Sequence, residues 1–164
     1  MIGVDLEKEE QYKLLFKQVE GLLNPEDPII TNLANIIAAI NQTFKNVSWV
    51  GIYIIKNEKL FLGPFQGKVA CTKIKIGEGV CGTSAMKKET IVGPNVHEYP
   101  GHIACDIESN SEIVVPIIYD GTVLGVLDLD STELSTFDDL DKIWLEMICT
   151  LIVNKLKFNP DILS

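Results

Sequence analysis

The chain has 164 residues, enough for one domain with a single substantial core. Its hydrophobic share of 46% and charged share of 23% exclude a disordered chain. The net charge of −9 argues against nucleic acid, because phosphate binding needs a basic face. The first residues are too polar for a secretory signal, and no apolar run reaches the roughly 20 residues of a membrane span. We therefore expect a cytoplasmic protein that binds neither nucleic acid nor membrane.

Apolar residues at helical spacing predict helices at both ends of the chain. Two of them lie within about 5–43 and are separated by an Asn-Pro pair that breaks the first pattern. A third lies within about 137–157. It follows Thr136, which with Asp139 three residues later is typical of an N-cap.

Between these helices the hydrophobic period changes to that of strands. The predicted strands are Val47–Ile55, Lys59–Leu62, Val69–Ile76, Glu112–Tyr119 and Thr122–Leu129. Asp120-Gly121, between the last two, is the strongest hairpin signal in the chain. Strands joined by tight turns pair antiparallel, so we expect an α+β fold with a mainly antiparallel central sheet flanked by helices. The sheet and its loops occupy about 47–131, and one domain, 1–164, accounts for the whole chain.

The segment Gly93–Ser111 fits neither period. It joins regular elements across about nineteen positions, and loops beyond about 12–15 residues in a compact domain are usually functional or disordered. Its aromatic, histidine and isoleucine residues argue against disorder. We interpret it as a working loop carried by a rigid sheet.

Four cysteines are the first candidates for chemistry. In a reducing compartment such thiols are more often reactive, metal-binding or buried than permanently paired. Cys149 lies in the most apolar part of the last helix and is interpreted as a packing group, whereas Cys71, Cys81 and Cys105 lie in or beside turns. A glycine turn opens a short helix at Cys81, and a helix N-terminus would lower the pKa of that thiol. Zinc is the competing interpretation, but no close Cys or His pair anchors it, so we expect no metal.

Three carboxylates give the second indication. Asp128 and Asp130 are two residues apart and therefore share one face of a strand. Counting outward from the Asp-Gly turn, Glu112 faces about Leu129 and emerges at the same end of the sheet. Crowded carboxylates raise one another's pKa, which keeps one protonated, and they also attract a cation. A solvated strand end is the alternative; a thiol beside such acids suggests redox chemistry on a small zwitterion.

Four segments carry a resemblance to a known family. GPFQGKVAC, GEGVCGTS, VHEYPGHIACDIESNSEIVVP and GVLDLDST resemble, in order and spacing, the free methionine-(R)-sulfoxide reductases, which are single-domain proteins with the GAF fold. The similarity runs from about Val47 to Ser131, and the block GHIACD…SNSEIV is specific to this family among GAF domains. The resemblance implies reduction of the free amino acid under oxidative stress, recycling by thioredoxin without a bound cofactor, and a homodimer.

The resemblance also implies roles for the cysteines. Cys105 corresponds to the nucleophile that attacks the sulfoxide sulfur and becomes a sulfenic acid. Cys71 corresponds to the resolving thiol that condenses with it to a disulfide. Cys81 matches a third cysteine for which attacking and auxiliary roles have both been proposed. The sequence alone does not decide which of Cys71 and Cys81 pairs first with Cys105.

The substrate site follows in the same way. Glu112, Asp128 and Asp130 correspond to the family's substrate-site acids. The sulfoxide oxygen is a very weak base that needs a proton as it leaves, so we place Glu112 and Asp130 near that oxygen and Asp128 near the substrate ammonium group. Trp49 and Tyr53 match aromatic positions that hold the methyl and thioether end, and their spacing puts them on one strand face.

One position departs from the family. Asn95 stands just before Val-His, where the family often has an acid, and an amide can hydrogen-bond an ammonium group without balancing its charge. The acids around Cys105 should also disfavour a thiolate there, so we expect that thiol to stay neutral until the substrate ammonium arrives.

Two other functions remain open: a GAF domain that only senses a small ligand, and a zinc-binding regulator.

Overall fold

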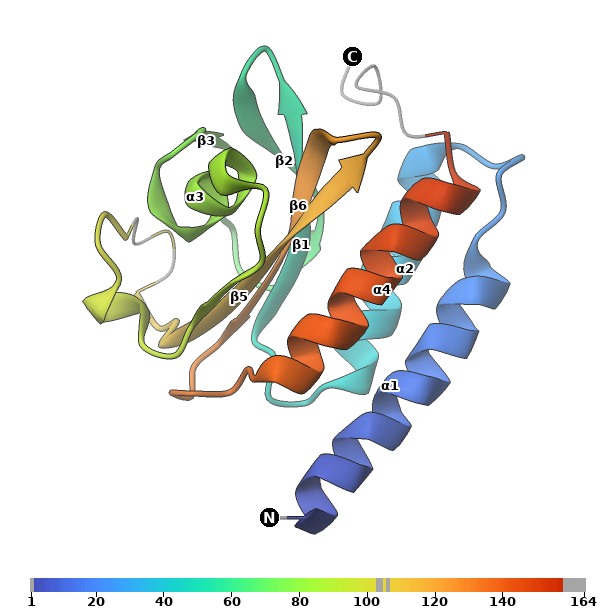
Figure 1. Ribbon diagram of the computed structural model, residues 1–164, viewed down its shortest axis with the longest axis horizontal. Coiled ribbons are helices and arrows are strands. Elements are labelled where there is room, and N and C mark those ends of the chain that lie inside the picture. The colour runs from blue at the N-terminus through green and yellow to red at the C-terminus, as the bar shows by residue number, and fades with distance from the viewer. Residues whose placement is uncertain (1, 103–104, 106, 158–164) are drawn as a thin grey trace.

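The computed structural model describes residues 2–102, 105 and 107–157. The helices are α1 (Ile2–Leu22), α2 (Ile29–Thr43), α3 (Gly79–Lys87) and α4 (Asp139–Lys155), with a 3-10 turn η1 (Val96–Glu98). The strands are β1 (Trp49–Lys56), β2 (Lys59–Gln66), β3 (Lys73–Lys75), β4 (Ile91–Gly93), β5 (Ser111–Tyr119) and β6 (Thr122–Ser131). Two long helices, α2 and α4, cover one face of a central sheet with the long helix α1 packed against them, and a short helix with several loops covers the other face (Figure 1).

The sheet confirms the predicted α+β class. Its six strands lie in the order β3-β2-β1-β6-β5-β4, and every neighbouring pair is antiparallel. Asp120-Gly121 forms the turn between β5 and β6, with positive φ at both residues as a two-residue hairpin requires. The three-residue strand β4 was not predicted, and the strand predicted at Val69–Ile76 shortens to β3.

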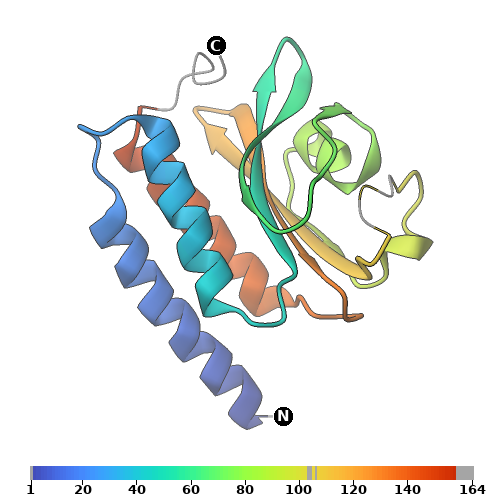
Figure 2. The ribbon, with the colours of Figure 1, turned by 180° about the vertical axis from the view of Figure 1, so that it is seen from behind.

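Strand β1 is buried on both sides because it lies between the two layers (Figures 1 and 2). Successive side chains of a strand point to opposite faces. Val50, Ile52 and Ile54 therefore pack into the core under α1, α2 and α4. Trp49 and Tyr53 point to the other face and pack in a second cluster beneath α3. The helices hold the sheet rigid from one side while the second face carries a cavity.

The beginning of α4 differs from the expectation. The N-cap is Asp138 rather than Thr136, and it forms a capping box with Asp141. The buried Asp141 carboxylate also accepts a hydrogen bond of 2.5 Å from the hydroxyl of Tyr12 and forms an ion pair with Lys8. These contacts tie α1 to α4, so α1 belongs to the same packed unit as the sheet.

The pairing of β5 with β6 differs by one residue from the predicted register. A bulge after Ile117 shifts the pairing, so Glu112 lies opposite Asp130 and not opposite Leu129. A shift of one residue moves a side chain to the other face of a sheet. The bulge therefore brings Glu112 onto the same face as Asp128 and Asp130.

None of the helices in the described part of the chain is long and apolar enough to cross a membrane.

Candidate active site

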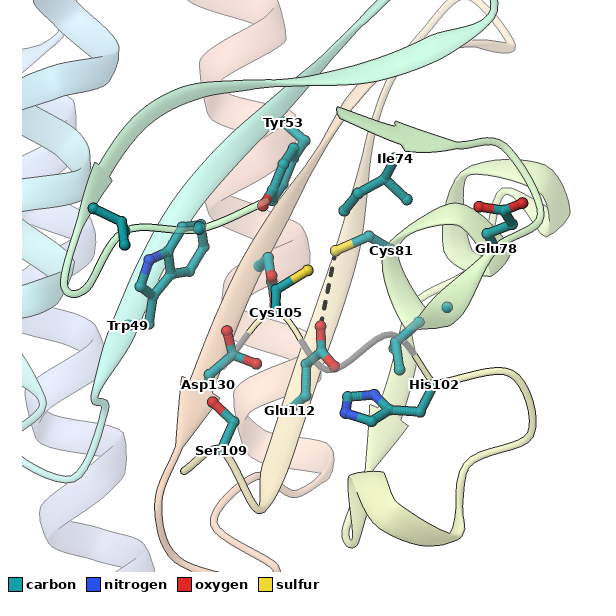
Figure 3. A pocket seen from close by; sticks show the side chains of 15 residues that line it. Trp49, Tyr53, Ile74, Glu78, Cys81, His102, Cys105, Ser109, Glu112 and Asp130 are labelled. Carbon is teal, nitrogen blue, oxygen red and sulfur yellow. Dashed lines mark hydrogen bonds between the residues drawn. The ribbon is translucent and has the colours of Figure 1, made fainter. Parts of the chain in front are cut away.

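A cavity of about 60 Å³ lies between the second face of the sheet and α3, closed by the loops after β2 and before β5 (Figure 3). Seven of the nine predicted site residues line it: Trp49, Tyr53, Cys81, Cys105, Glu112, Asp128 and Asp130. An eighth, Cys71, is bonded to Cys105 at the wall. In Figure 3 the carboxylates of Glu112 and Asp130 point into the space around Cys105.

Cys71 and Cys105 form a disulfide in this structure. They are separated by 34 residues in the sequence, and their Cα atoms are 5.5 Å apart, within the usual range for a disulfide. Cys71 comes from the segment between β2 and β3, and Cys105 from the long loop before β5. Of the two pairings left open by the sequence, the structure contains the one with Cys71, while Cys81 is a free buried thiol.

The pKa of the Cys81 thiol is shifted in the direction opposite to the one expected from the sequence. Cys81 is the third residue of α3, only 4% exposed, and its Sγ donates to Oε1 of Glu112 at 3.8 Å. Burial, followed by the charges of Asp128, Glu112 and Asp130, raises the pKa of this thiol well above its usual value. The expectation that the helix N-terminus would lower it is wrong, because desolvation and three acids outweigh the helix dipole. Cys81 is therefore a neutral thiol that donates to the carboxyl group of Glu112.

Glu112 and Asp128 are buried acids in the wall of the cavity. They are 6% and 5% exposed, and burial raises the pKa of both carboxyls well above the ordinary range. The charge of Asp128 adds to the rise in the pKa of Glu112, and the charge of Asp130 adds to that of Asp128. Hydrogen bonding between the two favours the proton on Glu112 and the charge on Asp128. The pair thus combines a proton donor with an anion.

A cation could bind to the buried acids with an oxygen of Asp128 as one ligand. Oδ1 of Asp128 is buried without a hydrogen-bond partner in the described part of the chain. One ligand atom each of Cys81, Glu112 and Asp128 lies within 4.8 Å of the others, so the three could hold a metal ion. The same oxygens suit an ammonium group, which forms hydrogen bonds as well as carrying the charge. That the protein needs no metal stays a prediction.

Trp49 and Tyr53 stack in the cavity wall with ring centroids 6.0 Å apart. Their polar atoms point to the neighbouring segment between β2 and β3. Nε1 of Trp49 donates to the carbonyl oxygen of Lys68 at 3.0 Å, and the hydroxyl of Tyr53 donates to that of Cys71 at 2.9 Å. Burial and the nearby acids raise the pKa of Tyr53, so its hydroxyl remains a donor. The rings offer apolar surface to a ligand and hold the segment that carries Cys71.

Asn95 is the predicted residue that the structure does not bring into the cavity. Its side-chain oxygen accepts a hydrogen bond of 3.1 Å from the backbone N–H of His97 and caps η1. Three lining residues with polar side chains were missed as site residues: Glu78, His102 and Ser109. Burial and the charge of His97 lower the pKa of His102, so its ring is neutral at pH 7. His102 and Ser109 both lie in the loop Gly93–Ser111 that carries Cys105, which was a usable signal.

Known proteins share both the sequence and the fold. Residues 30–156 match the model of the GAF domain. The chain is 49% identical to GAF domain-containing protein A of Dictyostelium discoideum over 90% of this chain and 93% of that protein. It is 46% identical to the free methionine-R-sulfoxide reductase of Saccharomyces cerevisiae over 90% of this chain and 87% of that protein.

A solved structure gives the same result in three dimensions. The free methionine-R-sulfoxide reductase of Neisseria meningitidis in complex with its substrate is 39% identical, with a TM-score of 0.87 over 90% of this chain and 89% of that one. The chain belongs to the free methionine-(R)-sulfoxide reductase family. Its GAF fold is therefore confirmed by sequence and by structure. In this reductase-family chain the GAF cavity contains a disulfide and a buried group of acids.

Proposed function

We propose that this chain is an enzyme that reduces free methionine-(R)-sulfoxide to methionine by thiol chemistry, without a bound cofactor. The observation that carries the proposal is the Cys71–Cys105 disulfide at the wall of a cavity lined by acids, among them Glu112, Asp128 and Asp130. Membership of the reductase family supports the substrate. The disulfide is the state that such an enzyme would reach after one turnover.

The cavity supports binding of a small zwitterion in one orientation. The buried Oδ1 of Asp128, without a partner in the described ranges, would accept the substrate ammonium group. The methyl and thioether end would lie against the ring faces of Trp49 and Tyr53. Glu112 and Asp130 would then lie near the sulfoxide oxygen. Asn95 lies outside this cavity, so a role in ammonium binding would need a rearrangement of η1.

Glu112 is the proposed proton donor. The Cys105 thiol loses its proton and its sulfur bonds to the sulfoxide sulfur as Glu112 protonates the oxygen. The S–O bond of the substrate breaks, the hydroxyl moves to the Cys105 sulfur, and the bond between the two sulfurs breaks, which leaves a sulfenic acid on Cys105; the proton lost by the thiol restores Glu112. Methionine leaves, reduced by two electrons, and Cys105 is oxidised by two. The raised pKa of Glu112 keeps its proton available at neutral pH. Cys105 is proposed to stay neutral until the substrate ammonium balances the acids around it.

Cys71 completes the cycle. Its thiol attacks the sulfenic sulfur, the S–S bond forms, and the oxygen leaves as water. Thioredoxin is the proposed external dithiol that returns both cysteines to thiols.

A homodimer is also proposed, and the exposed apolar side chains of Ile143 and Met147, one turn apart on α4, support an apolar contact there.

Turnover with separated isomers tests the proposal. The protein is incubated with free methionine-(R)-sulfoxide or the (S) isomer and a dithiol reductant, and methionine is measured. We expect methionine from the (R) isomer, none from Cys105→Ser, and wild-type turnover from Cys149→Ser, whose thiol lies in the core away from the cavity. Undiminished turnover by Cys105→Ser would refute the proposal. Binding without turnover by the wild type would instead favour a ligand-sensing GAF domain.

A further inference from the structure

The segment that carries Cys71 has no regular structure of its own. Residues 67–72 connect β2 to β3, and Val69 and Ala70 within them line the cavity. Val69 is 88% exposed, and only the small side chains of Ala70 and Cys71 pack, partly buried, against the second cluster, so apolar burial holds this segment weakly. Whatever fixes its path determines whether the thiol of Cys71 can reach that of Cys105.

Two buried aromatic side chains of β1 fix this path. Nε1 of Trp49 and the hydroxyl of Tyr53 donate to the carbonyl oxygens of Lys68 and Cys71, at 3.0 and 2.9 Å. The rings are 4% and 2% exposed, so water competes little with these hydrogen bonds. The two bonds fix both ends of the stretch from Lys68 to Cys71.

Two glycines hold the indole beneath the segment. A Cβ at Gly51 would overlap the indole ring of Trp49 and lie 2.7 Å from Cβ of Phe65. Gly67 has φ of +133°, and a Cβ there would lie 2.5 Å from Cδ1 of Trp49. The backbone can therefore cross the indole closely only because both positions lack a side chain.

A third contact joins the segment to the loop of Cys105. The ammonium of Lys68 forms an ion pair with Glu108, but both side chains are about 60% exposed (62% and 60%). Exposed pairs are screened by solvent and stabilise little. The hydrogen bonds from Trp49 and Tyr53 are therefore the main side-chain anchors of the segment, beside the backbone hydrogen bond from the N–H of Leu62 to the carbonyl oxygen of Thr72.

We infer that Trp49 and Tyr53 are positioning residues for the disulfide: they hold the backbone of Cys71 where its thiol meets Cys105. Fixing the segment in advance raises the effective concentration of one thiol beside the other. The inference rests on the proposed function for the resolving role of Cys71. The bond itself forms whenever an oxidant removes two electrons and two protons from the thiols.

Equilibration with glutathione tests this positioning without substrate. Glutathione disulfide oxidises the two thiols to the Cys71–Cys105 bond and leaves as two glutathione thiols, and the bonded fraction is measured by acid quenching, alkylation and mass spectrometry. Tyr53→Phe removes one hydroxyl and keeps the ring. We expect the equilibrium constant for disulfide formation to fall about 2- to 10-fold, the effect of one net hydrogen bond. Trp49→Phe should lower it as well.

Tyr119→Phe is the matched control, because Tyr119 is 58% exposed at the β5–β6 turn. It should keep the wild-type equilibrium constant. Circular dichroism of the reduced variants establishes that each is folded, and a purely structural role would change unfolding without changing the redox equilibrium of folded protein. An unchanged equilibrium constant in folded Tyr53→Phe overturns the inference. Wild-type protein that forms the bond in glutathione but releases no methionine would refute the proposed function and leave the positioning intact.

Discussion

Replacing Glu112 by glutamine separates the stability of this site from its chemistry. The substitution keeps the shape of the side chain and removes its charge and its titration. The carboxyl of Glu112 is 6% exposed, and burial, followed by the charge of Asp128, raises its pKa well above the usual value. Glutamine can still donate a hydrogen bond to Asp128. The folded protein should therefore become more stable while losing its proton donor.

The pH dependence has a defined sign. A carboxyl whose pKa is raised by folding binds its proton more tightly in the folded state, so stability falls as pH rises from the unfolded pKa through the folded one. For Glu112 this decline begins near its ordinary value of 4.5. Below that pH, wild type and Glu112→Gln should unfold alike. At pH 8 the variant should be more stable by about 3–4 kcal/mol, because stability declines by about 1.4 kcal/mol for each pH unit over which only the folded state keeps the proton, from the unfolded pKa up to neutral pH.

Denaturant unfolding of the disulfide form between pH 4 and 8 measures this difference, with Glu133→Gln as a control because Glu133 is exposed. Each kcal/mol would also raise the melting temperature by about 2–4 °C in a chain of this size. Turnover should fall about 10²- to 10⁴-fold, as for loss of a general acid. A variant less stable than wild type at pH 8, or one with full turnover, would refute the reasoning.

Four further predictions concern other parts of the site. Asp128→Asn should raise KM about 10- to 100-fold, because a hydrogen bond to a charged ammonium loses its anion; steady-state kinetics with an unchanged KM would remove Asp128 from the ammonium site. Cys149→Ser should destabilise the core by about 1–3 kcal/mol in denaturant titration, because its hydroxyl lacks a partner there, and a large loss of turnover would contradict its packing role. Gly51→Ala should destabilise by about 1–3 kcal/mol and raise KM, because its Cβ displaces Trp49; wild-type stability would mean that the indole can move. Dialysis against EDTA should leave turnover unchanged, whereas a loss restored by zinc would favour a metal at Cys81, Glu112 and Asp128.

Local sequence patterns predicted which helices and strands form better than they predicted where each one begins and ends. The long helices and the β5–β6 hairpin follow from apolar spacing and from Asp120-Gly121, signals that need no tertiary context. The N-cap of α4 was misplaced because Thr136 and Asp138 are both good caps, and the capping box with Asp141 decides between them. The three-residue strand β4 is too short to show alternation.

The site depends on features that the local sequence does not display. The bulge opposite Ile117, whose extra residue is Leu124 of β6, puts Glu112 on the face of Asp128; Gly125 beside it is a weak signal that does not fix where the pairing shifts. The raised pKa of Cys81 arises from burial and from acids that lie at least 31 residues away in the sequence. Strand spacing and the Asp-Gly hairpin predicted that Glu112, Asp128 and Asp130 lie at one end of the sheet, and the resemblance to the reductase family supplied their roles. Their pKa shifts could be inferred only from the fold.

A single turnover tests the central claim most directly. Prereduced protein is mixed with free methionine-(R)-sulfoxide without any reductant, and released methionine and alkylatable thiols are counted together. The account predicts one methionine per chain, with loss of the thiols of Cys71 and Cys105 and retention of those of Cys81 and Cys149. Methionine released while Cys105 remains fully alkylatable would contradict it.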